Sequence, residues 1–141
     1  MILTCNFEEL LALTTGAELL LSGREVGAHG AVAAPAEVFA HVEMLRPRLA
    51  SALTIDTLDE QRSVQMAVQA ICDQLRERMD ETVFELHPAH EEAVALYFDY
   101  AHTYSVLRRL EEMGRQMSGL IELITGDEPT DVGAREIEFP D

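Results

Sequence analysis

Apolar residues recur at intervals of three and four over about seventy residues, from Asp56 to Thr125, and Pro88 is the only proline among them. Such intervals place side chains on one face of an α-helix. Proline lacks an N–H and disfavours helical angles in the preceding residue, here His87, but it suits the first turn of a new helix. The pattern therefore predicts two long helices, over residues 56–86 and 88–125, joined as a hairpin.

The first predicted helix has a well-defined start and a single apolar stripe. Asp56 or Thr57 can cap it, and Asp59 and Glu60 fall in the first turn, where the helix dipole favours negative charge. The stripe consists of Val64, Val68, Ile71, Leu75, Met79, Val83 and Leu86.

The second predicted helix carries a heptad pattern, with Gly126 as its stop signal. Thr103 and Gly114 are the weak positions in the two core rows. One row consists of Ala93, Tyr100, Leu107, Gly114 and Ile121, and the other of Leu96, Thr103, Leu110, Met117 and Ile124.

The predicted hairpin is long for a compact chain of this size. Its helices would span roughly 46 and 57 Å, whereas a compact chain of 141 residues is about 37 Å across. Either Gly114 or another position breaks the second helix, or a second copy covers the apolar stripe and completes a four-helix bundle. We favour the second alternative and expect a homodimer.

The N-terminal part of the chain predicts a short β-prone run and then a helix. Residues 1–5 form the run, and Asn6 can cap a helix from Phe7, with Glu9 at the third helical position as in a capping box. The Ser22–Gly23 pair predicts the end of this helix. Its expected inner face is Phe7, Leu10, Leu11, Thr14, Ala17 and Leu21.

Residues 23–34 are rich in Gly and Ala and predict a mobile loop. A further helix is expected from Pro35, and Pro47 must kink or divide it near Arg46. Its inner residues would be Val38, Val42, Leu45, Leu49 and Leu53.

These elements predict an all-α protein of about four helices, with one helical domain over residues 1–125. The acidic, proline-containing segment 126–141 is predicted to be a disordered tail. In an alternative interpretation, Arg135–Phe139 pairs as a strand with residues 2–5.

Composition constrains the partners and the compartment. The net charge is −16, with 26 acidic residues against 10 basic ones, all of them Arg. Binding to nucleic acid is disfavoured because phosphates need a basic face; the acidic surface serves solubility or a basic protein partner. No run approaches the roughly 20 apolar residues of a membrane span, and no signal peptide is evident. We expect no membrane association and a cytoplasmic location, in which Cys5 and Cys72 are reduced.

Four residues are the candidate ligands of a divalent metal. Carboxylate and imidazole groups three or four residues apart on a helix can converge on one ion, and Glu37 with His41 and Asp99 with His102 have this spacing. His102 projects away from the heptad core, and neither pair is a Glu-x-x-His motif. A metal site is therefore possible but not favoured, and no cofactor is favoured.

The turn between the long helices contains His87 and His90, followed by Glu91 and Glu92. His-x-x-His with carboxylates could hold a divalent ion, but helix initiation explains the same residues. His90 also aligns with Tyr97 and Tyr104, a line that could border a small-molecule pocket and is more often packing.

No nucleophile elbow or phosphate-binding loop is present in the sequence. We therefore expect a non-enzymatic helical interaction or structural protein that acts as a homo-oligomer with an unknown partner. The alternative is a helical bundle that binds a metal or small ligand, as an enzyme or a sensor, through its His and carboxylate residues.

Overall fold

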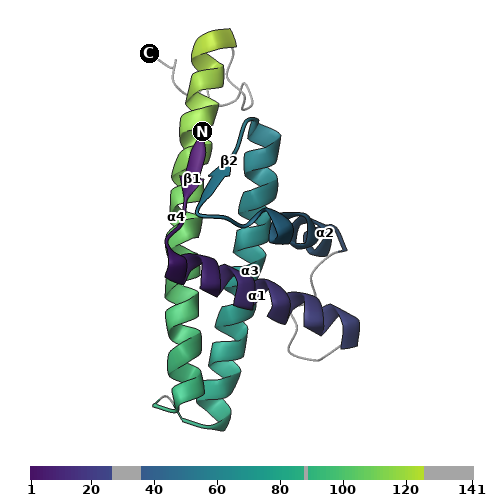
Figure 1. Cartoon of the computed structure of the whole chain (residues 1–141), viewed down its shortest axis with the longest axis vertical. Helices are drawn as coiled ribbons and strands as arrows, with labels where there is room; N and C mark the ends of the chain where they lie inside the picture. Colours follow the sequence, from purple (N-terminus) through teal and green to yellow (C-terminus); the bar gives the residue numbers. More distant parts are fainter. Residues whose placement is uncertain (27–35, 88, 126–141) are drawn as a thin grey trace, which may run out of the picture.

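The structure, a computed structural model, describes residues 1–26, 36–87 and 89–125 (Figure 1). The expected all-α class is confirmed, with four α-helices and one small two-stranded sheet in the described ranges. In chain order the elements are β1 (Ile2–Thr4), α1 (Phe7–Val26), α2 (Ala36–Leu45), a 3₁₀ turn (Arg46–Arg48), β2 (Ala52–Thr54), α3 (Leu58–Glu85) and α4 (Glu91–Thr125).

The predicted hairpin is the antiparallel pair α3 and α4, and it forms the long axis of the molecule (Figure 1). Helix α1 crosses both of its helices, and α2 packs on α3. The two strands lie along the same face of the hairpin, above α1 in Figure 1. The core therefore lies between the hairpin and one layer of shorter elements. Its largest fully buried apolar side chains are Leu13, Leu20, Ile55, Ile71, Leu75 and Leu110.

Both predicted helix caps are present. The Asn6 side-chain oxygen accepts the Glu9 N–H at 2.8 Å, and the Glu9 carboxylate accepts the Asn6 N–H at 2.9 Å, which is a complete capping box. Thr57 caps α3 by accepting the Glu60 N–H at 3.0 Å. The local sequence therefore determines where these two helices begin.

The prediction of helix through Leu49 and Leu53 is wrong beyond Pro47. As expected, Pro47 ends the helix, and α2 stops at Leu45 before the 3₁₀ turn. The chain then extends into β2, which pairs antiparallel with β1 so that Leu3 lies opposite Leu53. Residues 2–4 thus form the expected strand, and β2 is a partner that was not predicted. Most of the predicted loop lies in residues 27–35, outside the described residues. The predicted tail, residues 126–141, also lies outside them, and so does the alternative strand 135–139 within it.

The predicted inner face of α1 is correct only in part, since Ala17 and Leu21 are buried as expected. Phe7 is 72% exposed and Leu11 53% exposed. The helix continues to Val26, past the predicted end at Ser22–Gly23. Its buried side also includes Glu9, Leu13, Gly16 and Leu20, which were not predicted. These positions have helical spacing, but a carboxylate and a glycine interrupt their hydrophobicity, so apolar periodicity alone selects a neighbouring face.

The heptad of α4 is confirmed in its central part, where Thr103, Leu107 and Leu110 are buried. It fails at the C-terminal end, since Ile124 is 80% exposed. Val106 and Met113, outside the two predicted rows, are buried because α1 and the strands cover a second side of the helix.

Gly114 does not break α4, which is continuous from Glu91 to Thr125. A Cβ atom at position 114 would lie 2.8 Å from Nε2 of Gln61 on α3. Gln61 is buried, and this Nε2 donates to the Leu110 carbonyl at 2.7 Å and to Gln65 Oε1 at 2.8 Å. The glycine thus makes room for a polar contact between the two long helices.

Gly16 has a comparable role where α1 crosses α3, because a Cβ there would overlap the branched side chain of Ile71. We predict that Gly16→Ala destabilises the protein by about 1–3 kcal/mol through overpacking, despite a gain of roughly 1 kcal/mol in helix propensity. Gly119→Ala is the matched control, since nothing lies within 4 Å of its added Cβ. Urea unfolding should show the control unchanged or more stable; equal stabilisation by both changes would contradict the close crossing.

Candidate functional site

The first pair of candidate metal ligands lies on α2. Glu37 is exposed at the start of this helix. His41 is half-buried, and its Nδ1 lies 2.7 Å from Oγ of Ser63 on α3. One imidazole nitrogen of His41 therefore already takes part in a contact between two helices.

The second pair lies on α4. Nδ1 of His102 is 2.8 Å from the Phe98 carbonyl oxygen of its own helix. Asp99 is one of the residues that line a hollow between α1 and α4. Burial raises the pKa of its carboxyl group, while His102 acts in the opposite direction. Across residues 1–26, 36–87 and 89–125, no group of three or more His, Cys, Asp or Glu side chains is arranged to hold a metal ion.

We predict that neither pair of candidate ligands binds a divalent ion in solution. Adding Zn²⁺ or Mn²⁺ should leave the unfolding temperature unchanged, because only a ligand of the native state raises it by mass action. A metal-dependent rise that disappears in both His41→Ala and His102→Ala would contradict this expectation. Metal analysis of untagged protein is the independent check.

The two histidines of the hairpin turn contribute to its backbone hydrogen bonding. His87 Nδ1 accepts the Ala89 N–H at 3.0 Å, and His90 Nδ1 accepts the Glu92 N–H at 3.1 Å. These contacts support the interpretation of the His-x-x-His segment as a helix-initiation signal.

The two cysteines are free and buried. Burial raises the pKa of the Cys72 thiol to about 12, and nearby Asp73 and Glu111 act in the same direction. Burial also raises the pKa of Cys5. Since the thiolate is the reactive form, both side chains are poor nucleophiles at neutral pH.

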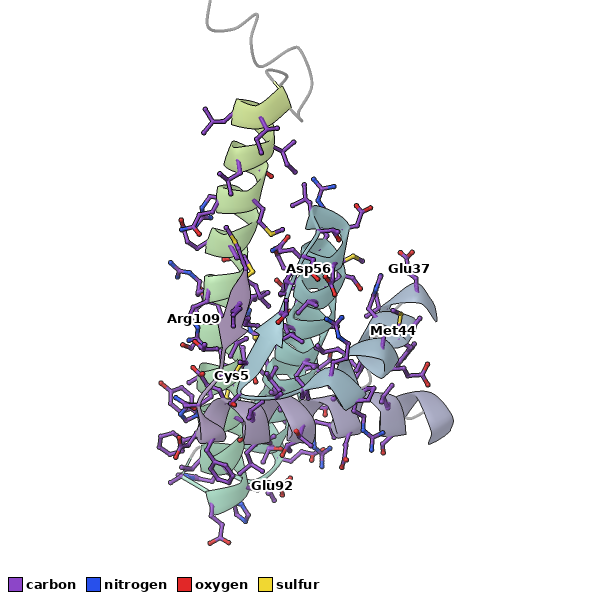
Figure 2. All side chains as sticks on the ribbon, turned by 45° about the horizontal axis from the view of Figure 1, so that its top comes forward. Cys5, Glu37, Met44, Asp56, Glu92 and Arg109 are labelled. Carbon is purple, nitrogen blue, oxygen red and sulfur yellow. The ribbon has the colours of Figure 1, made fainter. Side chains whose placement is uncertain are left out.

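An ion pair that the sequence analysis missed joins α1 to α4. The Arg109 guanidinium donates to both Glu9 carboxylate oxygens, at 2.7 and 3.0 Å, and to the Thr4 carbonyl at 2.9 Å. The Glu9 side chain is 7% exposed and that of Arg109 is 39% exposed. Figure 2 shows Arg109 and Cys5 on the same side, where the N-terminal segment meets α4. The pair joins residues one hundred positions apart, so local sequence patterns could not identify it.

Burial raises the pKa of Glu9, but the hydrogen bonds from Arg109 and Asn6 outweigh burial and hold the pKa below its ordinary 4.5. A lowered folded-state pKa stabilises the native state at pH values above the unfolded-state pKa, and this contribution is lost as the pH falls through the folded-state value.

We predict that Glu9→Gln lowers the free energy of unfolding at pH 7 by about 1–3 kcal/mol, because glutamine can retain the cap but loses the charged bonds to Arg109. The difference from wild type should narrow as the pH falls below 4.5. Glu8→Gln, at an exposed neighbour, is the control and should change stability by less than about 0.5 kcal/mol. If the difference in unfolding free energy between wild type and Glu9→Gln stayed constant down to pH 3, a charge effect would be excluded.

A groove of about 1040 Å³ runs along α3 and α4. The side chains of Leu20 and Val38 border it on the other side. Its charged lining is mixed, with Arg62 and Arg115 against Asp73, Glu111 and Glu122. This mixture gives the groove no clear preference for a charged ligand.

Exposed apolar side chains lie on both ends of the hairpin. At the C-terminal end of α4, Leu120, Leu123 and Ile124 are 50%, 81% and 80% exposed. The other end joins α3 to α4, and its exposed apolar side chains are Phe84, Leu86, Val94, Tyr97 and Phe98. Because exposed apolar clusters commonly mark interaction surfaces, these two ends are the candidate functional sites.

Comparison with known proteins gives no further guidance. No protein-family model matches the chain, and neither the curated proteins nor the solved structures contain a match. None of the described helices is long and apolar enough to cross a membrane.

Proposed function

We propose that this chain is a helical interaction protein that self-associates through the C-terminal end of α4 and acts by presenting the surfaces of its hairpin to other proteins. The observation that carries the proposal is the exposure of Leu123 and Ile124 on a helix that continues past its packing partner.

The geometry of the hairpin shows how far α4 continues. Gly114 lies opposite Gln61. Three residues of α3 precede Gln61, whereas eleven residues of α4 follow Gly114. The difference of about eight residues corresponds to an overhang of about 12 Å. Figure 1 shows this end of α4 projecting beyond α3.

Self-association would remove this apolar surface from water. Full burial of one Leu or Ile side chain contributes about 1.5–3 kcal/mol. In a two-fold dimer the same side chains of both copies meet, so each contact is made twice. The overhang continues the apolar row that contains Met117, which is buried at the hairpin's own interface. Helix packing could therefore extend from the monomer core into the dimer contact.

The proposal includes a cytoplasmic location, which the two free cysteines support. It does not require the groove to bind a small molecule.

We predict a dimer mass for the wild-type protein at micromolar concentration and a monomer mass for the double variant Leu123→Ser/Ile124→Ser. The double variant should keep its helical circular dichroism, because both side chains are largely exposed in the monomer. Light scattering coupled to size exclusion measures the mass.

Phe84→Ser is the matched control for the dimer experiment. This side chain is 91% exposed at the opposite end of the hairpin, so the variant should retain the dimer mass. A monomeric wild type, or a double variant that remains dimeric, would overturn the proposed mode of self-association.

A further inference from the structure

The turn end of the hairpin combines an apolar surface with concentrated negative charge. We define the hairpin tip as residues 80–87 and 89–98, which include the end of α3 and the start of α4. Phe84 is 91% exposed, and Tyr97 and Phe98 are 56% and 55% exposed. Leu86 and Val94 add exposed aliphatic surface. These side chains are not part of the monomer core.

Five carboxylates and no Arg or Lys lie within the hairpin tip. Among the described residues, the cation that contacts acids of the hairpin tip is Arg78, just before the tip in the sequence. Its guanidinium lies 3.8 Å from Glu81 and 3.6 Å from Glu92. Both contacts are long and exposed, so they neutralise little of the charge. Figure 2 shows Glu92 at this end of the molecule, far from the C-terminal end of α4. The acids are Asp80, Glu81, Glu85, Glu91 and Glu92.

A second copy of the chain is a poor partner for this surface. Two tips in contact would bring ten carboxylates together, and like charges across an interface are costly. The chain has ten basic residues against 26 acidic ones, so the rest of its surface is also a poor electrostatic match. An anionic membrane or a nucleic acid would be repelled for the same reason.

We propose that the hairpin tip binds a basic segment of another protein, rich in Arg or Lys and carrying a few apolar side chains. The carboxylates would attract the segment, and the apolar side chains would pack against Phe84 and Leu86. Arginine can also stack on exposed aromatic rings. Helix α4 itself shows this contact, since the Arg108 guanidinium lies 5.8 Å from the centroid of the Tyr104 ring.

The proposal goes beyond self-association and uses the opposite end of the hairpin. The two claims can therefore fail separately. Leu123→Ser/Ile124→Ser should abolish the dimer and leave the binding of a basic segment to each chain unchanged.

The test measures binding of a fluorescein-labelled synthetic peptide to the full chain by fluorescence anisotropy. The probe is an amphipathic peptide in which two Arg residues alternate with two Leu residues. In the control peptide, Gln replaces every Arg. Wild type should bind the Arg peptide more tightly than the Gln peptide. The affinity should fall with added salt, since exposed charges are screened.

Two triple variants with equal charge change test where the probe binds. The tip variant Asp80→Asn/Glu85→Gln/Glu91→Gln should weaken binding about ten-fold, the sum of three exposed charge interactions. The control Glu8→Gln/Glu37→Gln/Asp59→Asn removes the same charge from exposed positions elsewhere and should weaken it by less than about two-fold.

Phe84→Ser/Tyr97→Ser tests the apolar part and should also weaken binding while the mass stays that of wild type. Equal weakening by the two charge variants would show non-specific attraction to an acidic protein and would overturn the proposal. So would failure of wild type to bind the Arg peptide at low salt. A loss of dimer mass in Phe84→Ser/Tyr97→Ser would instead identify the tip as a contact between copies and would also overturn it.

Discussion

The one-sided covering of the long hairpin determines the rest of this structure. Its two helices have 28 and 35 residues, and the shorter elements of the described ranges do not cover their full length (Figure 1). Helices α1 and α2 and the strand pair cover one face, over the central part of the hairpin (Figure 1). The ends extend beyond this cover, and there apolar side chains stay exposed. The candidate surfaces thus follow from an imbalance between hairpin length and covering layer.

The covering layer is held in place by a few specific contacts. Glu9 completes the cap of α1 and accepts hydrogen bonds from Arg109 of α4. One carboxylate therefore fixes both the start of α1 and its position on α4. Arg109 also binds the Thr4 carbonyl and so connects β1 to the same point. Gly16 then permits α1 to approach α3 closely. Disturbing these positions should affect docking of the layer more than the hairpin itself.

The features that the sequence predicted are those with local causes. The hairpin, both helix caps and the break at Pro47 depend on residues within a few positions of each other, and all were predicted. The features it missed depend on distant partners. The buried face of α1 contains Glu9 and Gly16, whose burial is explained only by Arg109 and Ile71. The β1–β2 pairing was missed for the same reason, because the sequence of a three-residue strand does not identify its partner strand.

The same distinction applies to the candidate sites. Residue spacing nominated Glu37 with His41 and Asp99 with His102, but spacing cannot show that His41 contacts Ser63 on another helix. Residue spacing places Tyr97 in an aromatic line and Leu86 in the core stripe of the first long helix, and it predicts no role for Phe84. Only the structure shows that these three side chains are exposed and belong to the turn end of the hairpin.

The described residues at the two ends of the hairpin differ in charge, and this difference bears on the two proposed contacts. Within residues 120–124 the overhang of α4 has the single carboxylate Glu122, although the acidic segment 126–141 follows it in the sequence. Helix contact between two overhangs would therefore bring fewer carboxylates together than contact between two tips. The hairpin tip carries five carboxylates, which disfavour that contact. A dimer joined antiparallel at the overhang would hold its two tips at opposite ends. A protein with two suitably spaced basic segments could then engage both tips, and the second contact would benefit from a high effective concentration.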